Sequence, residues 1–136
     1  MRLVIDTNVF MAGLLKDSIV RKVLSSENIQ FFIPEHALDE LEKHKNTLIK
    51  KVNINVAEFD EMVSLLLENI EAVPESKIKA KFKEAEAVMK DIDIKDSPFI
   101  ATVLSIECDG LLTFDEHFQK QNKIKIFKIK DLINIL

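Results

Sequence analysis

The chain has 136 residues, of which 47% are hydrophobic and 31% are charged, and its formal net charge is −4. This composition excludes a disordered chain, and the length predicts one globular domain over residues 1–136 that buries roughly two-thirds of its unfolded surface. The single cysteine, Cys108, excludes both an internal disulfide and a cysteine-rich zinc site, and we expect it to be a small buried side chain.

The first predicted element is a strand over residues 3–5, which ends at Asp6. Its unbroken apolar residues indicate a strand buried on both faces, as in a parallel sheet between helices. Two capping residues and a helical apolar pattern follow. Asp6 therefore either caps a helix or marks the carboxyl end of a central strand, where ligands of α/β sheets bind.

The sequence shows no targeting or membrane-spanning segment. Asp6 interrupts the first apolar run too early for a signal peptide, and no apolar run is long enough to span a membrane. Together with the lone Cys108, this predicts a cytoplasmic protein.

Helices and strands alternate along the next part of the chain. The predicted elements are helical residues 9–26 with a break and cap at Asp17 and Ser18, a strand at 29–33, helices at 34–51 and 55–69, a strand at 70–73 and a helix at 77–89. Compact apolar runs indicate the strands, and apolar residues three to four positions apart indicate the helices.

Glu40 is the acid of the 34–51 helix that is best placed to face the sheet. On a helical wheel four apolar residues form one stripe: Ala37, Leu38, Leu41 and Leu48. Glu40 lies on the border of this stripe. The other acids point outward: Glu35, Asp39 and Glu42. His36 and His44 lie a turn away on the same edge, and we interpret this sparse pair as packed or solvated side chains rather than zinc ligands.

The last third of the chain repeats the arrangement of a strand that ends at an acid. Its predicted elements are a helix from 97 to 106, a strand over 110–114, a fifth strand over 124–129 and a short terminal helix capped by Asp131. Asp96 opens the first helix, and Asp115 ends the first strand. The alternation of strands and helices predicts an α/β fold with three layers, in which a central five-stranded parallel sheet lies between helices.

Four carboxylates are predicted to converge at one edge of this sheet: Asp6, Glu40, Asp96 and Asp115. They repel each other unless cations lie among them, and oxygen ligands of this kind select Mg²⁺ or Mn²⁺. Such a site activates water and stabilises a phosphodiester during displacement. The two glycines, Gly13 and Gly110, are too few for the loops that bind dinucleotides or nucleotide phosphates, so we expect no nucleotide cofactor.

Four stretches of the chain occur in an order that matches a known family. They cover residues 5–9, 34–41, 93–101 and 113–118, and they contain the four acids. Together they resemble the PIN-domain nucleases over essentially the whole chain, in particular the small stand-alone members among VapC-type toxins and their archaeal relatives. The resemblance implies a PIN-like fold and metal-dependent cleavage of RNA, with two metal ions at the acids.

The same resemblance implies roles for individual residues. The metal-binding and catalytic residues are Asp6, Glu40, Asp96 and Asp115, with Glu40 either sharing metal binding or orienting the attacking water. Asn8 and Thr113 match positions that support these acids by hydrogen bonds, and Asp93 assists from outside the direct ligands. Asp91 and Asp93 are both close enough in sequence to take the place of Asp96.

The main hypothesis is therefore an endoribonuclease, as in the toxin of a VapBC-type pair, with an antitoxin protein as a partner. The resemblance also implies a homodimer, for which the two apolar-rich helices before the third strand offer surface. A catalytically degenerate PIN domain that binds RNA or a protein is the alternative. A phosphatase of the D-x-D-x-T type is disfavoured, because Asn8 stands where that motif has its second acid.

The net charge of −4 does not exclude RNA, because two divalent ions would bring the formal total to zero (−4 + 4 = 0). Nine lysines are placed to contact phosphates or to remain solvated: Lys77, Lys79, Lys81, Lys83, Lys120, Lys123, Lys125, Lys128 and Lys130. Lys125 and Lys128 also suit an edge strand, where charge opposes pairing with another sheet.

Overall fold

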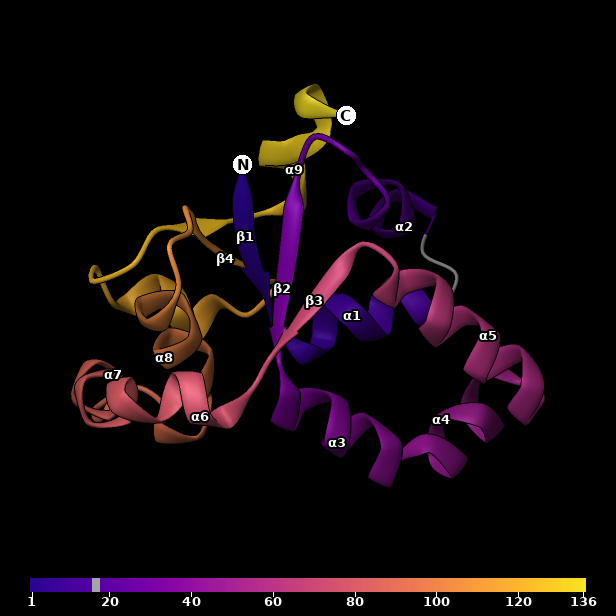
Figure 1. The fold of residues 1–136 in the computed structure, drawn as a ribbon, viewed down its shortest axis with the longest axis horizontal. Helices are drawn as coiled ribbons and strands as arrows, with labels where there is room; N and C mark the ends of the chain where they lie inside the picture. Colours follow the sequence, from indigo (N-terminus) through magenta and orange to yellow (C-terminus); the bar gives the residue numbers. More distant parts are fainter. Residues whose placement is uncertain (16–17) are drawn as a thin grey trace.

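The computed structural model describes residues 1–15 and 18–136, and its centre is one five-stranded parallel sheet in the order β3-β2-β1-β4-β5 (Figure 1). The strands are β1 (Arg2–Ile5), β2 (Gln30–Pro34), β3 (Ile70–Val73), β4 (Gly110–Leu112) and β5 (Ile126–Phe127). Helices cover both faces of this sheet. The structure thus confirms the predicted three-layer α/β/α fold with a parallel sheet.

The helices fall into two groups on either side of the strands (Figure 1). One group is α1 (Thr7–Leu14), α2 (Ser18–Leu24), α5 (Val56–Leu67) and α9 (Ile129–Leu132). The other is α6 (Glu75–Ile78), the 3₁₀ turn η1 (Lys79–Lys81), α7 (Phe82–Met89), η2 (Ile94–Asp96) and α8 (Ser97–Ser105).

Among the described residues, no helix combines the length and the apolar character needed to cross a membrane.

The central strand β1 creates the point at which the functional residues meet. Leu3, Val4 and Ile5 are fully buried, as the unbroken apolar run predicts. β1 pairs with β2 on one side and with β4 on the other, and Ile5 is in register with Leu112. The chain leaves these neighbouring strands in opposite directions along the sheet, which opens a crevice beyond their carboxyl ends.

Gly110 allows β4 to lie close to the edge strand. A Cβ atom at this position would lie 2.2 Å from the backbone oxygen of Lys125 and 2.9 Å from Cε1 of Phe127. The same Lys125 oxygen accepts a hydrogen bond from the N–H of Leu111 at 3.0 Å. Any side chain at Gly110 would therefore disturb the pairing that holds β4 and β5 together.

The predicted helix over residues 34–51 is in fact two helices, α3 (Glu35–Lys43) and α4 (Lys45–Val52). They are divided at His44, whose backbone angles of φ −99° and ψ 9° leave the α-helical region. The next residue, Lys45, forms an ion pair with Asp60 of α5 at 2.6 Å. Figure 1 shows α4 turned towards α5, so a tertiary contact accompanies a bend that the apolar stripe does not reveal.

Other element ends differ from the predictions because side chains satisfy the backbone locally. β5 covers only Ile126–Phe127, since the N–H of Ile124 is bound by the side chain of Gln121 at 3.0 Å. At the other end the carboxylate of Asp131 accepts the N–H of Lys128 at 2.7 Å, so α9 begins before Asp131. The predicted 77–89 helix begins earlier, at Glu75, and is interrupted by η1.

The break predicted at Asp17 lies outside the described residues, and α2 begins just after it, at Ser18. Cys108 is only partly buried, and burial raises the pKa of its thiol. The remaining turns are η3 (Glu116–Lys120), which follows β4, and η4 (Ile133–Ile135) near the end of the chain.

Candidate metal centre

Asp6 follows β1 and is 4% exposed. Its Oδ1 accepts a hydrogen bond from the N–H of Val9 at 3.0 Å, and its Oδ2 accepts one from the hydroxyl of Thr113. Both interpretations of Asp6 are therefore correct, because one oxygen caps α1 while the carboxylate lies at the end of the central strand. Burial raises the pKa of Asp6, and the charge of Asp115 adds to the shift, whereas the hydrogen bonds from Thr113 and Val9 oppose it.

Thr113 joins the ends of the two neighbouring strands. It is 2% exposed, and its hydroxyl oxygen accepts the N–H of Asp115 at 2.9 Å while the hydroxyl donates to Asp6. The register between Ile5 and Leu112 places Asp6 and Thr113 next to each other at the start of the crevice. The carboxylate of Asp115 in turn accepts the N–H of His117 at 2.9 Å, which begins η3.

Asp96 lies where η2 passes into α8. Its backbone has helical angles and its side chain makes no capping hydrogen bond, so Asp96 does not cap α8 through its carboxylate. Within the described part of the chain its Oδ2 atom is buried without a hydrogen-bond partner. Burial, followed by the charges of Asp93 and Asp115, raises the pKa of Asp96 to about 6, although His117 opposes the shift. A bound cation would supply the partner that this oxygen lacks.

A pocket of about 280 Å³ brings the four predicted acids together. Its lining residues are Asp6, Thr7, Asn8, His36, Glu40, Lys95, Asp96, Phe99 and Asp115. Glu40 enters from α3, and its side chain is exposed, as is that of Asn8. The ring of His36 packs against Phe99 at 5.6 Å between centroids, which agrees with the interpretation of His36 as a packed side chain.

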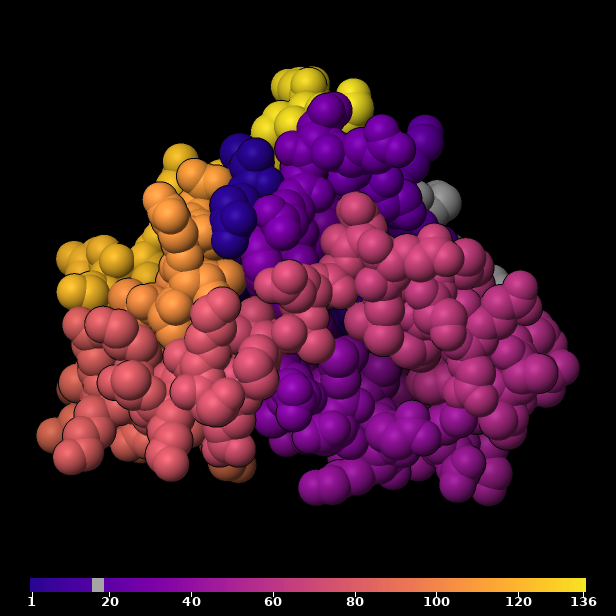
Figure 2. All heavy atoms as spheres, in the orientation of Figure 1, coloured from indigo at the N-terminus to yellow at the C-terminus, as the bar shows by residue number. Residues whose placement is uncertain are grey.

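Two further pockets adjoin this one and share lining residues with it. The first, of about 370 Å³, has Glu40 at its border and apolar walls from Met11, Leu41 and Leu48. The second, of about 210 Å³, is lined by Glu35, His36, Glu75, Ile78, Phe82 and Pro98. Figure 2 shows the helices on either side of this second pocket as two masses, α6 with α7 and α3 with α4, with a notch between them.

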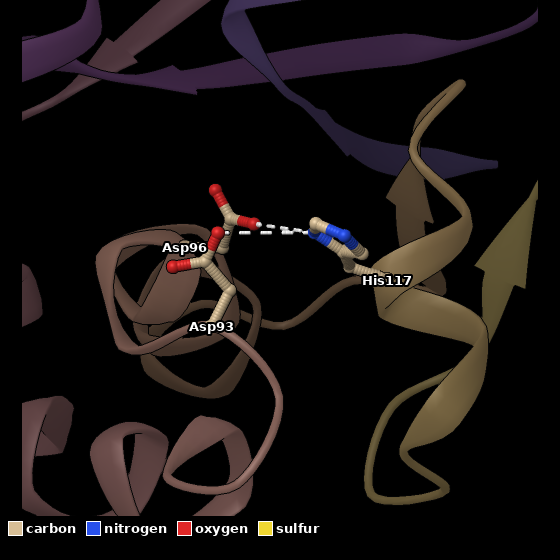
Figure 3. A group of neighbouring side chains, drawn as sticks. All are labelled: Asp93, Asp96 and His117. Carbon is tan, nitrogen blue, oxygen red and sulfur yellow. Dashed lines mark ion pairs between the residues drawn. The ribbon is translucent and has the colours of Figure 1, made fainter.

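His117 is a residue that the sequence interpretation missed. Its Nδ1 lies 3.4 Å from Oδ1 of Asp115 and 3.8 Å from Oδ2 of both Asp93 and Asp96 (Figure 3). One ligand atom each from Asp93, Asp96 and His117 lie within 4.8 Å of one another, as in a metal site. Asp91 is exposed and outside this group, so Asp93 is the nearer companion of Asp96. The sequence contains one indication of this position, since His117 stands two residues after Asp115, an acid that follows a strand.

Within the described part of the chain, four of the nine predicted lysines have side-chain partners nearby. Lys81 and Lys123 both lie near Glu84, at 3.9 and 3.7 Å. β5 is an edge strand as predicted, but Lys125 and Lys128 flank it and do not lie within it. The ammonium of Lys125 lies 4.8 Å from the centre of the Phe127 ring, and that of Lys128 lies 3.3 Å from Glu116. Lys95, which was not among the predicted phosphate contacts, is one of the residues that line the acidic pocket.

The fold and the pocket define a class of α/β protein in which acids gather at the switch point of a parallel sheet. A family model described as the PIN domain matches residues 4–125, a range that includes all four acids and Thr113. The chain belongs to the PIN-domain family, which is in general a family of nucleases. A comparison with curated proteins gives no match.

Proposed function

We propose that the protein is an Mg²⁺- or Mn²⁺-dependent endoribonuclease that hydrolyses RNA phosphodiester bonds in the acidic pocket. The buried, unpartnered Oδ2 of Asp96 among three further carboxylates supports this most directly. An all-oxygen donor set of this kind fits two divalent ions held by Asp6, Glu40, Asp96 and Asp115. When bound, such ions activate water and neutralise the charge that develops on the phosphodiester.

The residues of the pocket have two kinds of role: some bind the metal ions, and others orient the attacking water or the RNA phosphate. Asp6 is fixed by Val9 and Thr113, and Asp115 is fixed to the same hydroxyl through its backbone, so these two acids keep a constant separation. Glu40 reaches the pocket from a helix with an exposed carboxylate that is free to orient the attacking water. Asn8 and Lys95 line the pocket, and we propose that their side chains donate to the phosphate oxygens of bound RNA.

RNA is the substrate class that the family membership supports. The notch between α3 and α6 offers an RNA strand a path away from the acids. The pocket in this notch adjoins the acidic pocket, since His36 lines both. We further propose that residues 1–136 act as one domain and that the protein is the toxin of a toxin–antitoxin pair, with a protein antitoxin in the cytoplasm. We also propose a homodimer, for which α5 offers exposed apolar side chains on more than one face, such as Val56 (51% exposed) and Leu65 (52% exposed).

One gel assay tests the proposed activity. Purified protein is incubated with single-stranded RNA in Mg²⁺, in Mn²⁺ and in EDTA, beside the Asp96→Asn variant. We expect internal cuts that require the metal and the carboxylate, because carboxylates do not activate water without a bound metal ion. Undiminished cutting in EDTA would contradict the proposal. Retarded but intact RNA with every metal would favour the degenerate, RNA-binding alternative.

A further inference from the structure

Asp93, Asp96 and His117 form a donor group beside the acidic pocket and not wholly within it. Asp96 lines the pocket, whereas Asp93 and His117 are not among its lining residues. Figure 3 shows the imidazole of His117 reaching from η3 towards two carboxylates that come from the segment around η2. Asp96 therefore belongs to both places, and Asp115, which also lines the pocket, has its Oδ1 3.4 Å from Nδ1 of His117.

The distances in this group are too long for hydrogen bonds and suit a shared ion. The Nδ1 of His117 lies 3.8 Å from each of the Oδ2 atoms of Asp93 and Asp96, beyond the usual hydrogen-bond length of roughly 2.7–3.2 Å. Ligand atoms bound to one ion at about 2.1 Å lie roughly 3–4 Å from each other. The separation seen here is within that range.

The oxygens that face His117 also have free acceptor capacity. Asp93 uses its Oδ1 for the N–H of Lys95 at 3.1 Å, which leaves its Oδ2 directed at the imidazole. The Oδ2 of Asp96 is the buried oxygen that has no hydrogen-bond partner in the described residues. Two carboxylate oxygens and one imidazole nitrogen thus point into a common space, and the nitrogen is a donor that the four-acid set lacks.

We propose that Asp93, Asp96 and His117 bind a transition-metal ion, and that the nitrogen of His117 makes this position prefer such an ion to Mg²⁺. The inference rests on the proposed function for the neighbouring ion, with which it shares Asp96. Mg²⁺ favours oxygen ligands and keeps several of its waters, whereas an imidazole nitrogen favours transition ions. The position formed by Asp93, Asp96 and His117 should therefore discriminate between transition-metal ions and Mg²⁺, whereas the position formed by carboxylates alone should not.

The test uses Mn²⁺ as the probe, because its electron spin reports directly on a coordinated nitrogen. The full chain is titrated with Mn²⁺ to saturation, and pulsed EPR records the coupling to ¹⁴N. The chain has three histidines, so the variants His117→Gln, His36→Gln and His44→Gln identify the source of the signal. We expect the ¹⁴N coupling in the wild type and in the His36 and His44 variants, and its loss in His117→Gln.

Affinity provides a second measurement. Loss of a ligand should cost at least what loss of a ligand's supporting partner costs, so we expect His117→Gln to weaken Mn²⁺ binding at this position by roughly tenfold or more. Its affinity for Mg²⁺ should hardly change. Asp93→Asn should weaken Mn²⁺ binding while the ¹⁴N coupling persists. The side chain of His117 is 48% exposed, so the variant should keep its fold, and a melting curve in EDTA verifies this.

Each failure has its own meaning. Mn²⁺ that binds without any ¹⁴N coupling would overturn the role of His117 and leave the carboxylate centre in place, with His117 as a simple counter-charge. Coupling that disappears in His36→Gln instead would overturn it as well. A chain that binds no Mn²⁺ at all would overturn both this inference and the proposed function.

Discussion

Asp6 and Glu40 line the same pocket but depend on different kinds of support. Asp6 follows the central strand, is 4% exposed and accepts hydrogen bonds on both oxygens. Glu40 is carried by α3, is exposed, and among the described residues its side chain has no hydrogen-bond or ion-pair partner. The carboxylate that follows the strand is thus held in place before any ligand binds, whereas the carboxylate on α3 can change its orientation. Substitutions on the two sides should therefore separate stability from activity.

Asp96, at the start of α8, should give the largest effect. The Asp96→Asn substitution removes the charge whose buried oxygen lacks a partner, so we expect RNA cleavage to fall on the order of 1,000-fold. The same variant should melt at a higher temperature than wild type in EDTA, because like-charge repulsion is relieved. In Mg²⁺ the difference in melting temperature should shrink or change sign, since only wild type gains stability from bound metal. Equal metal-induced shifts of the melting temperature in both proteins would show that Asp96 is not a ligand.

Glu40 should give a smaller loss of activity with no loss of stability. In Glu40→Gln we expect cleavage to fall on the order of 100-fold, as for removal of a group that positions water, at an unchanged melting temperature. Glu35→Gln and Asp39→Asn on the same helix are matched controls, because neither residue lines the acidic pocket. Loss of cleavage in Glu35→Gln in place of Glu40→Gln would mean that the other face of α3 serves the site.

Thr113 should affect both properties at once. Thr113→Val keeps the shape of the side chain but leaves the buried Oδ2 of Asp6 without its donor, which should cost about 1–3 kcal/mol in the free energy of unfolding. Cleavage should fall roughly tenfold as Asp6 and Asp115 lose their common support. Thr102→Val is the control, since this buried hydroxyl donates to the carbonyl oxygen of Pro98 at 2.7 Å, within its own helix. It should lower stability without affecting cleavage, and an equal loss of cleavage in both variants would remove the special role of Thr113.

The pH dependence of stability should show the smallest effect. The pKa of Asp96 in the folded protein is raised to about 6 from 3.8, so between these pH values the folded state binds more protons than the unfolded state. Stability in EDTA should therefore be highest near pH 4 and fall as the pH rises to 6. Solvent near this partly exposed group reduces the change to on the order of 1 kcal/mol. Urea unfolding at pH 4.5 and 6.5 measures it, and a flat profile in wild type, or the same slope in Asp96→Asn, would contradict this origin.

The sequence predicts the sheet and the four-acid pocket for the same physical reason. An unbroken apolar run such as residues 3–5 must be buried on both faces, and the residue after it must then lie at the sheet edge. Glu40 was predictable from the border of a helical stripe, and its place in the pocket agrees with that position. These inferences need only periodicity and the geometry of parallel strands.

His117 and the division of the helix at His44 were beyond such inference. The direction of His117 depends on η3, which begins with a hydrogen bond from its own N–H to Asp115, and no periodicity shows that turn. The bend after His44 accompanies an ion pair between Lys45 and Asp60, fifteen positions further on. Both features arise from single polar contacts in the folded chain, whose partners the pattern of apolar residues does not specify.

The position of β1 at the centre of the sheet has a consequence for the synthesis of the chain. β1 is synthesised before β4, its neighbour in the sheet, and Asp6 accepts the hydrogen bond of Thr113 only when β4 has paired with β1. Asp115 reaches the pocket in the same step. A nascent or truncated chain that stops before residue 110 therefore lacks one wall of the acidic pocket. The proposed cleavage of RNA can thus begin only after the chain has been translated through Asp115.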